Sequence, residues 1–384
     1  MNICYKPCFA TPSPALKYRP LSMLMLDCWQ REYDKIPYRH FKFEVLNFEN
    51  RYQRPYDPVQ DLSIIIKFIK TRSLISVKLV GIQILPNNNN ELLDTFIESL
   101  KNLRHIELTM MQLPLEFFEL LVCNVEKMKI KELNLQGTFL TDEDISCLRS
   151  FLIKSRTIQY LNVSSCDLNQ FNFAILADGI YKSSSLMAFN ANRLLGKDLS
   201  LDSEKIVHTL ASLLWQNKLQ KIEMEKCEFM AHDMEILAEY LCNASSSLLH
   251  LNVAYNKIGP DGAYHLLKAI ALSGTLKYLN MNGCGLGSHG AQHIAKYLSS
   301  CARLESLLLQ FNHMESEDVS MILLTIKKPI KLNELALWGN KYNTRTGSIL
   351  RRLIESQVLP QDAIDITYTS DDTIPGWRVI PWRN

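Results

Sequence analysis

The sequence predicts an α/β solenoid of about ten strand–helix repeats, with a parallel sheet on the concave face. Three observations predict this fold: the pattern LxxLxLxxN/C recurs at a nearly constant step, each copy starts with alternating apolar residues, and the rest of each copy is helical in pattern. The chain has 384 residues, of which 47% are hydrophobic and 21% charged, as in folded proteins. Because one compact core rarely holds so many residues, two domains or a repeat architecture is expected.

The repeat is evident from the positions at which the pattern begins. The successive steps are 29, 27, 28, 28, 33, 29, 28, 28 and 28 residues. The ten copies begin at Leu74, Leu103, Ile130, Ile158, Leu186, Leu219, Leu248, Leu276, Leu304 and Leu332.

The first half of each copy, such as LLHLNVAYNKI from Leu248, has the alternation of a strand with one buried face. Leucines at positions one, four and six should point inward, and positions three, five, seven and eight should face the concave side. At position nine, Asn could hydrogen-bond the turning backbone and Cys could fill the core. Such cysteines should be buried and reduced. The position-nine residues are Cys166, Cys227, Asn256, Cys284, Asn312 and Asn340.

The second half of each copy predicts a helix, over residues 260–270 and 290–298 in two clear copies. Apolar residues there fall at i, i+3, i+4 and i+7, so one helix face should pack inward. A strand and a helix differ in width, and stacked units should therefore curve, with the helices on the convex side.

Caps are expected at both ends, because no repeat can bury its leucines alone. The predicted organisation is a flexible tail over 1–20, an N-terminal cap over 21–73, repeats over 74–357 and a C-terminal cap or tail over 358–384. Residues 57–70 should form a helix that starts near Pro58, and 347–356 should form the last helix. The tail carrying Trp377 and Trp382 should lie across the final edge. The aromatic and basic segment 21–56 is a cap in one interpretation and a docking arm in another.

Two motifs suggest a cofactor-binding or metal-binding site. Residues 285–290 match GxGxxG and Glu305 follows 20 residues after Gly285, as in a dinucleotide-binding fingerprint. The corresponding loop of the preceding copy lacks the motif, and Glu305 is simply the second residue of the next copy. His289 and His293 have i, i+4 spacing, but no general-base glutamate lies between them and no third ligand is evident. The sequence therefore predicts no catalytic, cofactor-binding or metal-binding residues, and we expect no enzyme.

The net charge of +2, from 42 basic and 40 acidic residues, does not favour nucleic-acid binding. The N-terminus shows no secretory signal, and apolar stretches such as 62–69 are too short to cross a bilayer. We expect a monomer without nucleic-acid or membrane partners, in the cytoplasm or in a nuclear, nucleolar or ciliary location. In a reducing compartment, free thiols are expected for the ten cysteines.

A repeat of about 28 residues with a full helix resembles the ribonuclease-inhibitor type of leucine-rich repeat, a horseshoe that binds proteins. A narrower resemblance covers residues 130–370. The long repeat from Leu186, with Asn192-Arg193 and the helix start at 204–208, is similar to the middle repeat of the animal family of leucine-rich-repeat-containing protein thirty-four. The ending at 338–342 and 353–360 is similar too, whereas residues 1–57 do not match. The resemblance implies a cytoplasmic or nucleolar protein of germ-cell or ciliated-cell differentiation that acts through partners, and it transfers no catalytic residues.

The predicted binding surface is the concave face toward the C-terminus. Aromatic side chains on this face do not belong to the hydrophobic core, and exposed aromatic side chains are typical of interface centres. Gly283, between Tyr255 and Phe311 at position eight, should leave a slot for a partner's side chain, with Trp338 as one wall. A charged zone in the middle copies should set specificity and encounter rate. The predicted protein-binding residues are Tyr255, Tyr278, Leu308, Phe311, Trp338, Arg193, Lys221, Glu223, Glu225 and Lys226.

The function predicted from these features is a non-catalytic, intracellular protein-interaction scaffold. One alternative is a structural component of a ciliary or axonemal assembly, which fractionation would detect in the microtubule pellet. A second is an enzyme inhibitor of the ribonuclease-inhibitor type. The near-zero net charge argues against a basic ribonuclease as its target, since such an enzyme favours a strongly acidic face. The sequence does not name the partner.

Overall fold

The structure is a computed structural model, which describes residues 45–49, 57–58, 62–71, 74–84, 90–194, 202–215, 218–242, 247–327, 332–371 and 374–382. It divides into two compact units. Unit 1 contains the described residues up to Cys166 together with 182–185, and unit 2 contains 167–181 and the described residues from Leu186 onward.

One strand lies at positions three to five of each of the ten predicted copies, so the predicted repeat fold is confirmed. Within each unit these repeat strands follow one another in chain order in a parallel sheet, and β1 is added before the first copy. Those of unit 1 are β1 (Val45–Glu49), β3 (Ser76–Val80), β5 (His105–Thr109), β6 (Glu132–Asn134) and β7 (Tyr160–Asn162). Those of unit 2 are β8 (Ala188–Asn190), β9 (Lys221–Glu223), β10 (His250–Asn252), β11 (Tyr278–Asn280), β12 (Ser306–Leu308) and β13 (Glu334–Ala336).

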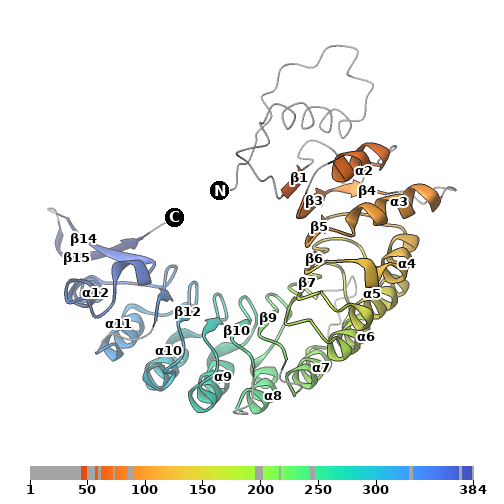
Figure 1. Cartoon of the computed structure of the whole chain (residues 1–384). Helices are drawn as coiled ribbons and strands as arrows, with labels where there is room; N and C mark the ends of the chain where they lie inside the picture. Colours follow the sequence, from red (N-terminus) through yellow and green to blue (C-terminus); the bar gives the residue numbers. More distant parts are fainter. Residues whose placement is uncertain are drawn as a thin grey trace, which may run out of the picture. The chain divides into compact units, whose positions relative to one another are not determined.

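A helix follows each of the strands β8 to β13, and Figure 1 shows these strands on the inner side of the curve of unit 2 and the helices on its outer side. We call these two surfaces the sheet face and the helix side. The helices and short helical turns of the chain are α2 (Leu62–Thr71), α3 (Asn90–Leu100), α4 (Leu115–Cys123), η2 (Val125–Lys127), α5 (Asp142–Lys154), α6 (Gln170–Lys182), α7 (Ser203–Trp215), α8 (Ala231–Leu241), α9 (Gly259–Ser273), α10 (Gly287–Tyr297), η3 (Leu298–Ser300), α11 (Ser316–Thr325), α12 (Thr344–Glu355) and η4 (Gln361–Ala363).

The core of unit 2 is built from leucine ladders that run from repeat to repeat. The position-four residues Leu251, Leu279, Leu307 and Leu335 are partners in the parallel register of β10 to β13, and all are fully buried. Positions one and six are buried in the same way, as the alternation predicted. Because each leucine packs against copies before and after it, the repeats stabilise one another.

The residues at position nine form a second ladder, in which each buried side chain makes hydrogen bonds to the backbone of the preceding repeat. Asn256 Oδ1 accepts hydrogen bonds from the N–H groups of Cys227 and Phe229, at 2.8 and 3.2 Å. Where Cys replaces Asn, its Sγ donates to a carbonyl of the preceding repeat, as Cys284 does to Val253 O at 3.4 Å. The predicted roles of both residue types at this position are therefore confirmed.

The seven cysteines among the described residues are free thiols, of which Cys166, Cys227, Cys284 and Cys301 are buried and Cys123 and Cys242 exposed. Burial raises the pKa of Cys227 and of Cys284 to about 12, and that of Cys301 to about 11. Since the thiolate is the reactive form, these buried thiols stay protonated and inert at pH 8.

We therefore expect a thiol reagent such as dithionitrobenzoate at pH 8 to modify Cys123 and Cys242 in native protein, and to reach the buried four only after denaturation. Unfolded thiols ionise near pH 8.5, so the stability from protonated buried thiols is fully present below that pH and is lost as the pH rises through about 12. Rapid labelling of Cys227 or Cys284 in the native protein, read by mass spectrometry of peptides, would contradict the assigned register.

The predicted N-terminal helix begins later than expected. Helix α2 starts at Leu62, while Asp57 and Pro58 form β2, which pairs with β4 (Ile82–Gln83). Proline suits the short edge strand as well as a helix start, because neither position requires its missing N–H. The predicted tail 1–20 and most of the segment 21–56 lie outside the described residues.

The C-terminal segment forms a hairpin of β14 (Ile366–Asp371) and β15 (Ile374–Pro381) that packs on α12. Trp377 lies under the guanidinium of Arg351, 4.3 Å from its ring centroid. Gly347 of α12 lies against the Trp377 backbone, and a glycine is needed there because a Cβ would come within 2.3 Å of Trp377 O. Trp382 N donates to Asp365 O at 2.8 Å. No helix in the described residues is long and apolar enough to span a bilayer.

Candidate functional site

The residue at position eight, where the strand turns into the loop, has a left-handed backbone in every repeat. This position has φ between +52° and +82° in all ten copies. An L-residue here costs about 1–2 kcal/mol relative to glycine, and glycine indeed fills four copies. The position-eight residues are Gly81, Met110, Gly137, Ser165, Arg193, Lys226, Tyr255, Gly283, Phe311 and Gly339. We call the last six, all in unit 2, the position-eight row.

Each large apolar side chain at position eight leans over a glycine at position eight of the next repeat. A Cβ on Gly283 would lie 2.5 Å from Tyr255 Cδ1, and one on Gly339 would lie 2.2 Å from Phe311 Cδ1. Met110 and Gly137 form a similar pair in unit 1, at 3.0 Å. The predicted open slot at Gly283 is therefore wrong, because the ring of Tyr255 itself fills the space above this glycine.

The ring–glycine contact predicts the effect of Gly339→Ala. We expect a loss of about 1–3 kcal/mol in the free energy of unfolding, because alanine is strained at φ +82° and its Cβ displaces the Phe311 ring. Gly285→Ala is the matched control, since Gly285 has φ +68° and no atom lies within 4 Å of the place that a Cβ would take there. Urea titration of both variants would measure the difference, and equal losses would contradict the ring contact.

The two rings of the position-eight row are substantially exposed, by 44% for Tyr255 and 46% for Phe311. The Lys226 ammonium lies 5.1 Å from the Tyr255 ring centroid, a cation–π contact. Each ring already packs on the backbone of a glycine. Binding of a partner would therefore cost little side-chain conformational entropy.

Trp338 lies apart from this arrangement. Its ring is half-buried and stacks with Tyr342 at 6.2 Å between centroids, and its backbone N–H donates to Asp365 Oδ2 at 3.0 Å. The backbone N–H of Leu337 donates to the same carboxylate. Trp338 thus joins the last repeat to the C-terminal cap, and the expected slot that it would wall is filled.

The charged residues form an internally bonded group around Glu223. Lys221 Nζ lies 2.8 Å from Glu223 Oε1, His250 Nε2 lies 3.5 Å from the same oxygen, and Asn190 Nδ2 donates to Oε2 at 2.7 Å. Burial acts to raise the pKa of Glu223, but the polar contacts with His250 and Lys221 outweigh it, and the pKa is lowered. Glu225 Oε1 accepts a hydrogen bond from Asn252 Nδ2 at 2.6 Å.

Tyr278 extends this group toward the C-terminus. Its ring stacks on that of His250, with 3.8 Å between centroids and an interplanar angle of 6°. Burial raises the pKa of Tyr278 to about 12, so its hydroxyl stays protonated at neutral pH. Leu308 is half-buried, with Asn280 and Ala336 as its neighbours in the register.

The ten predicted binding residues all lie on the sheet side of unit 2. Of these, Arg193, Lys226, Tyr255 and Phe311 are the exposed ones. Sequence reasoning missed His250, although it stands at position three, in register with Lys221 and Tyr278. It also treated the position-five asparagines as open surface. Asn162, Asn190, Asn252 and Asn280 are buried and Asn134 is half-buried, and each of these side chains hydrogen-bonds its own turning backbone, as Asn252 Oδ1 does by accepting from Ala254 N at 3.1 Å.

The glycine-rich motif at 285–290 has a structural explanation. Gly287 N donates to Asn312 O at 3.0 Å, and a Cβ on Gly290 would lie 2.6 Å from Leu286 Cβ. The carboxylate of Asp318 accepts a hydrogen bond from Ser288 Oγ at 2.6 Å. Its negative charge would repel a phosphate at the start of α10. His293 packs against Tyr264 at 5.1 Å, and within the described ranges no three His, Cys, Asp or Glu residues gather as metal ligands would.

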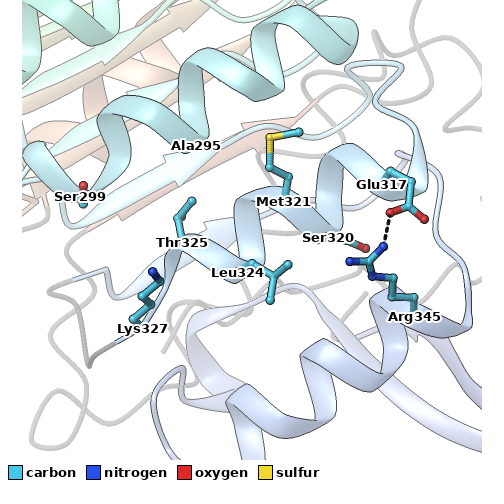
Figure 2. Close-up of a pocket in the computed structure, with 9 residues that line it drawn as sticks. All are labelled: Ala295, Ser299, Glu317, Ser320, Met321, Leu324, Thr325, Lys327 and Arg345. Atoms are coloured by element: carbon cyan, nitrogen blue, oxygen red, sulfur yellow. Dashed lines mark hydrogen bonds and ion pairs between the residues drawn. The ribbon is translucent and has the colours of Figure 1, made fainter.

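The helix side of unit 2 carries a groove of about 650 Å³, shown in Figure 2. Met321 and Leu324 of α11 give it apolar walls, and Glu317 and Arg345 pair across its edge at 3.0 Å. The groove is lined by Ala295, Ser299, Glu317, Ser320, Met321, Leu324, Thr325, Lys327 and Arg345.

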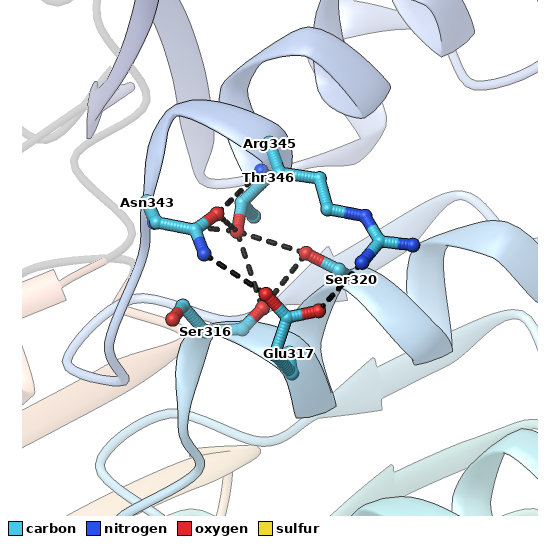
Figure 3. Close-up of polar contacts among 6 residues, drawn as sticks. All are labelled: Ser316, Glu317, Ser320, Asn343, Arg345 and Thr346. Carbon is cyan, nitrogen blue, oxygen red and sulfur yellow. Dashed lines mark hydrogen bonds and ion pairs between the residues drawn. The ribbon is translucent and has the colours of Figure 1, made fainter.

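The polar edge of this groove belongs to a network that joins α11 to the start of α12 (Figure 3). Asn343 caps α12 by accepting from Thr346 N at 2.9 Å and donates to Glu317 Oε1 at 3.1 Å. The hydroxyls of Thr346 and Ser320 lie 2.9 Å apart in the core. Because these groups satisfy one another, the network has a structural role.

Comparison with known proteins supports the repeat assignment. Residues 244–267 and 273–295 match the family described as "Leucine Rich repeat". A mouse (Mus musculus) relative, "NACHT, LRR and PYD domains-containing protein 4B", is 26% identical over 151 residues, which is 38% of this chain. The chain spans 16% of that relative's length.

One solved structure shares the fold, and a second is less similar. The "Crystal structure of Rad7 and Elc1 complex in yeast" contains a chain with a TM-score of 0.52 and 19% identity, over 81% of this chain and 76% of that one. A chain of the "Crystal structure of TLR13-ssRNA13 complex" has a TM-score of 0.41 and 17% identity, over 71% and 41% of the two chains. The ten strands at the predicted positions, the family match and the shared fold identify the chain as a leucine-rich-repeat solenoid.

Proposed function

We propose that the protein is a non-catalytic interaction scaffold that binds a protein partner on the sheet face of unit 2. The observation that carries the proposal is the pair of half-exposed rings, Tyr255 and Phe311, each seated on a glycine of the next repeat. Rings with a fixed orientation and no core role are typical of interface centres. The Rad7 and Elc1 complex, which contains a chain of the same fold, supports binding of a protein partner.

The resemblance to the family of leucine-rich-repeat-containing protein thirty-four supports a setting in germ cells or ciliated cells, in cytoplasm, nucleolus or cilium. This part of the proposal depends on the repeat from Leu186 and the ending at 338–342. Affinity purification from ciliated and germ cells, followed by fractionation, would test it. Recovery in the microtubule pellet would favour the structural alternative over a soluble scaffold.

The binding face is tested by the double change Tyr255→Ala and Phe311→Ala. We expect captured partners to be lost, since truncating a central aromatic commonly costs about 2 kcal/mol or more, or about 30-fold in affinity. The melting temperature should barely move, because both rings are half-exposed. Trp338→Ala is a poorer probe, since its ring supports Tyr342.

The control is the double change Lys268→Ala and Lys296→Ala on α9 and α10, on the helix side. Each lysine there covers a tyrosine ring, Tyr264 and Tyr297, without joining the sheet face. Quantitative mass spectrometry of affinity-purified partners compares both variants with the wild type. If the sheet-face variant keeps the partners and the helix-side variant loses them, the binding surface lies on the other side of the solenoid.

A further inference from the structure

We propose that the partner presents an acidic side chain to Arg193 and Lys226, and apolar side chains to Tyr255 and Phe311, within one extended segment. This segment would run along the position-eight row. The inference rests on the proposed function, because it specifies the chemistry of the partner for the same face.

The first observation concerns unbalanced charge. Arg193 and Lys226 are exposed, and within the described part of the chain neither has a carboxylate at ion-pair distance. The neighbouring charges are occupied: Glu223 pairs with Lys221, and Glu228 pairs with Lys257. Glu225, which precedes Lys226 in the chain, accepts a hydrogen bond from the Asn252 amide. Arg193 and Lys226 thus stand in consecutive repeats without an ion-pair partner among the described residues, and an acidic group from a partner would supply one.

The second observation is the backbone at these two residues. Arg193 and Lys226 have φ of +57° and +53°, at the left-handed position that four of the ten repeats fill with glycine. A strained backbone that holds a side chain without a core role is more common at functional sites than elsewhere. Both side chains are exposed in the position-eight row, and Lys226 contacts the Tyr255 ring.

The third observation is the spacing along the row. Backbone hydrogen bonds place the residues in consecutive repeats: Arg193 N donates to Glu225 O, Lys226 N to Ala254 O and Tyr255 N to Asn282 O. Neighbouring repeats lie about 5 Å apart, so three steps from Lys226 to Phe311 span about 15 Å. An extended peptide rises about 3.3 Å per residue, which places the acidic residue about four to five residues from the apolar residue on Phe311.

Cations beside aromatic rings also suit single-stranded nucleic acid. The charges favour a protein segment, because a nucleic-acid backbone carries a phosphate at every nucleotide and needs a continuous basic groove. Here only the N-terminal end of the row is basic, and Glu223, Glu225 and the exposed Glu334 lie on the same face. A protein segment with one acidic side chain and apolar residues beyond it can meet the two cations and the two rings, and it brings far less negative charge against these glutamates than a nucleic-acid backbone does.

A peptide array tests the inference with the purified full chain. Wild-type protein should select Asp or Glu at one position, with Leu, Phe or Trp about four to five residues away. The charge-swap variant Arg193→Glu with Lys226→Glu should select Lys or Arg at that position instead. Lys268→Glu with Lys296→Glu, which makes the same charge change on the helix side, should keep the wild-type selection.

The other outcomes overturn the inference in distinguishable ways. Selection of apolar peptides without an acidic preference, lost in Tyr255→Ala with Phe311→Ala, would leave the binding face standing and refute the acidic partner. Absence of any selected peptide would refute the linear segment, while the affinity purification decides on the proposed function separately. Tighter binding of a labelled single-stranded RNA oligonucleotide than of the selected peptides, measured by anisotropy, would identify the row as a nucleic-acid surface.

A final variant separates binding from a structural role. Arg193→Gly with Lys226→Gly removes both cations and relieves the left-handed strain. We expect at least about tenfold weaker binding of the selected acidic peptide, the effect of losing one moderate contact, with a melting temperature that is unchanged or higher. A lower melting temperature would show that the two side chains serve the fold, and would contradict the inference.

Discussion

Leu279→Ala should destabilise the protein by about 2–5 kcal/mol, the usual cost of truncating a buried leucine. Leu279 is fully buried in β11, between Leu251 and Leu307 of the flanking strands. The neighbouring side chains cannot move far into the cavity that the missing leucine side chain leaves, because each of them is packed against the next repeat. Chemical denaturation gives the change in free energy of unfolding.

The damage should spread along the stack from the mutated repeat. Hydrogen exchange should accelerate first in β10, β11 and β12, since repeat stability is approximately a sum of neighbour terms. Lys277→Ala is the control: its ion pair with Glu305, at 2.8 Å, is exposed and should contribute at most about 1 kcal/mol. Acceleration confined to the N-terminal repeats would show that the stacking order is wrong.

Asn312→Ala should cost about 2–4 kcal/mol through lost hydrogen bonds, since each buried backbone group left without a partner costs about 1–3 kcal/mol. The fully buried Asn312 accepts from Cys284 N at 2.9 Å and donates to Met281 O at 2.8 Å. Both partners belong to the preceding repeat, so the amide side chain joins two coils. Thermal or urea denaturation measures the loss.

Asn312→Cys is the matched variant, because cysteine occupies position nine in three other repeats. Its thiol can donate to one carbonyl, as Cys284 does, but it replaces the carbonyl acceptor of asparagine poorly. We therefore expect Asn312→Cys to fall between the wild type and Asn312→Ala. A cysteine variant as unstable as the alanine variant would show that neither the added volume nor the thiol donor contributes, and that the amide group of asparagine is required at this position.

The repeat could be predicted from the sequence because the buried positions recur in one-dimensional order. A leucine at position four faces the core in every copy, as Leu251 and Leu279 do, since a strand alternates its faces regardless of distant contacts. The same regularity showed that Gly285 and Gly290 belong to the loop and helix of a repeat and not to a dinucleotide-binding motif. The helix starts were predicted less accurately: α2 begins at Leu62, because the short pairing of β2 with β4 takes up Asp57 and Pro58.

The sequence by itself determined the repeat, its register, the buried position-nine residues and the side of the solenoid that carries the exposed aromatics. Only the tertiary structure decided how neighbouring repeats use that side: Tyr255 fills the space over Gly283, Trp338 turns to Tyr342, and Glu223 is occupied by Lys221 and His250. The contacts of Tyr255 with Gly283 and of Glu223 with His250 join neighbouring repeats, 28 and 27 positions apart in the sequence, and the first of them depends on the left-handed backbone at position eight. Periodicity gives the face on which a side chain lies, but the neighbour that it meets there depends on backbone angles and on the space left by the next coil.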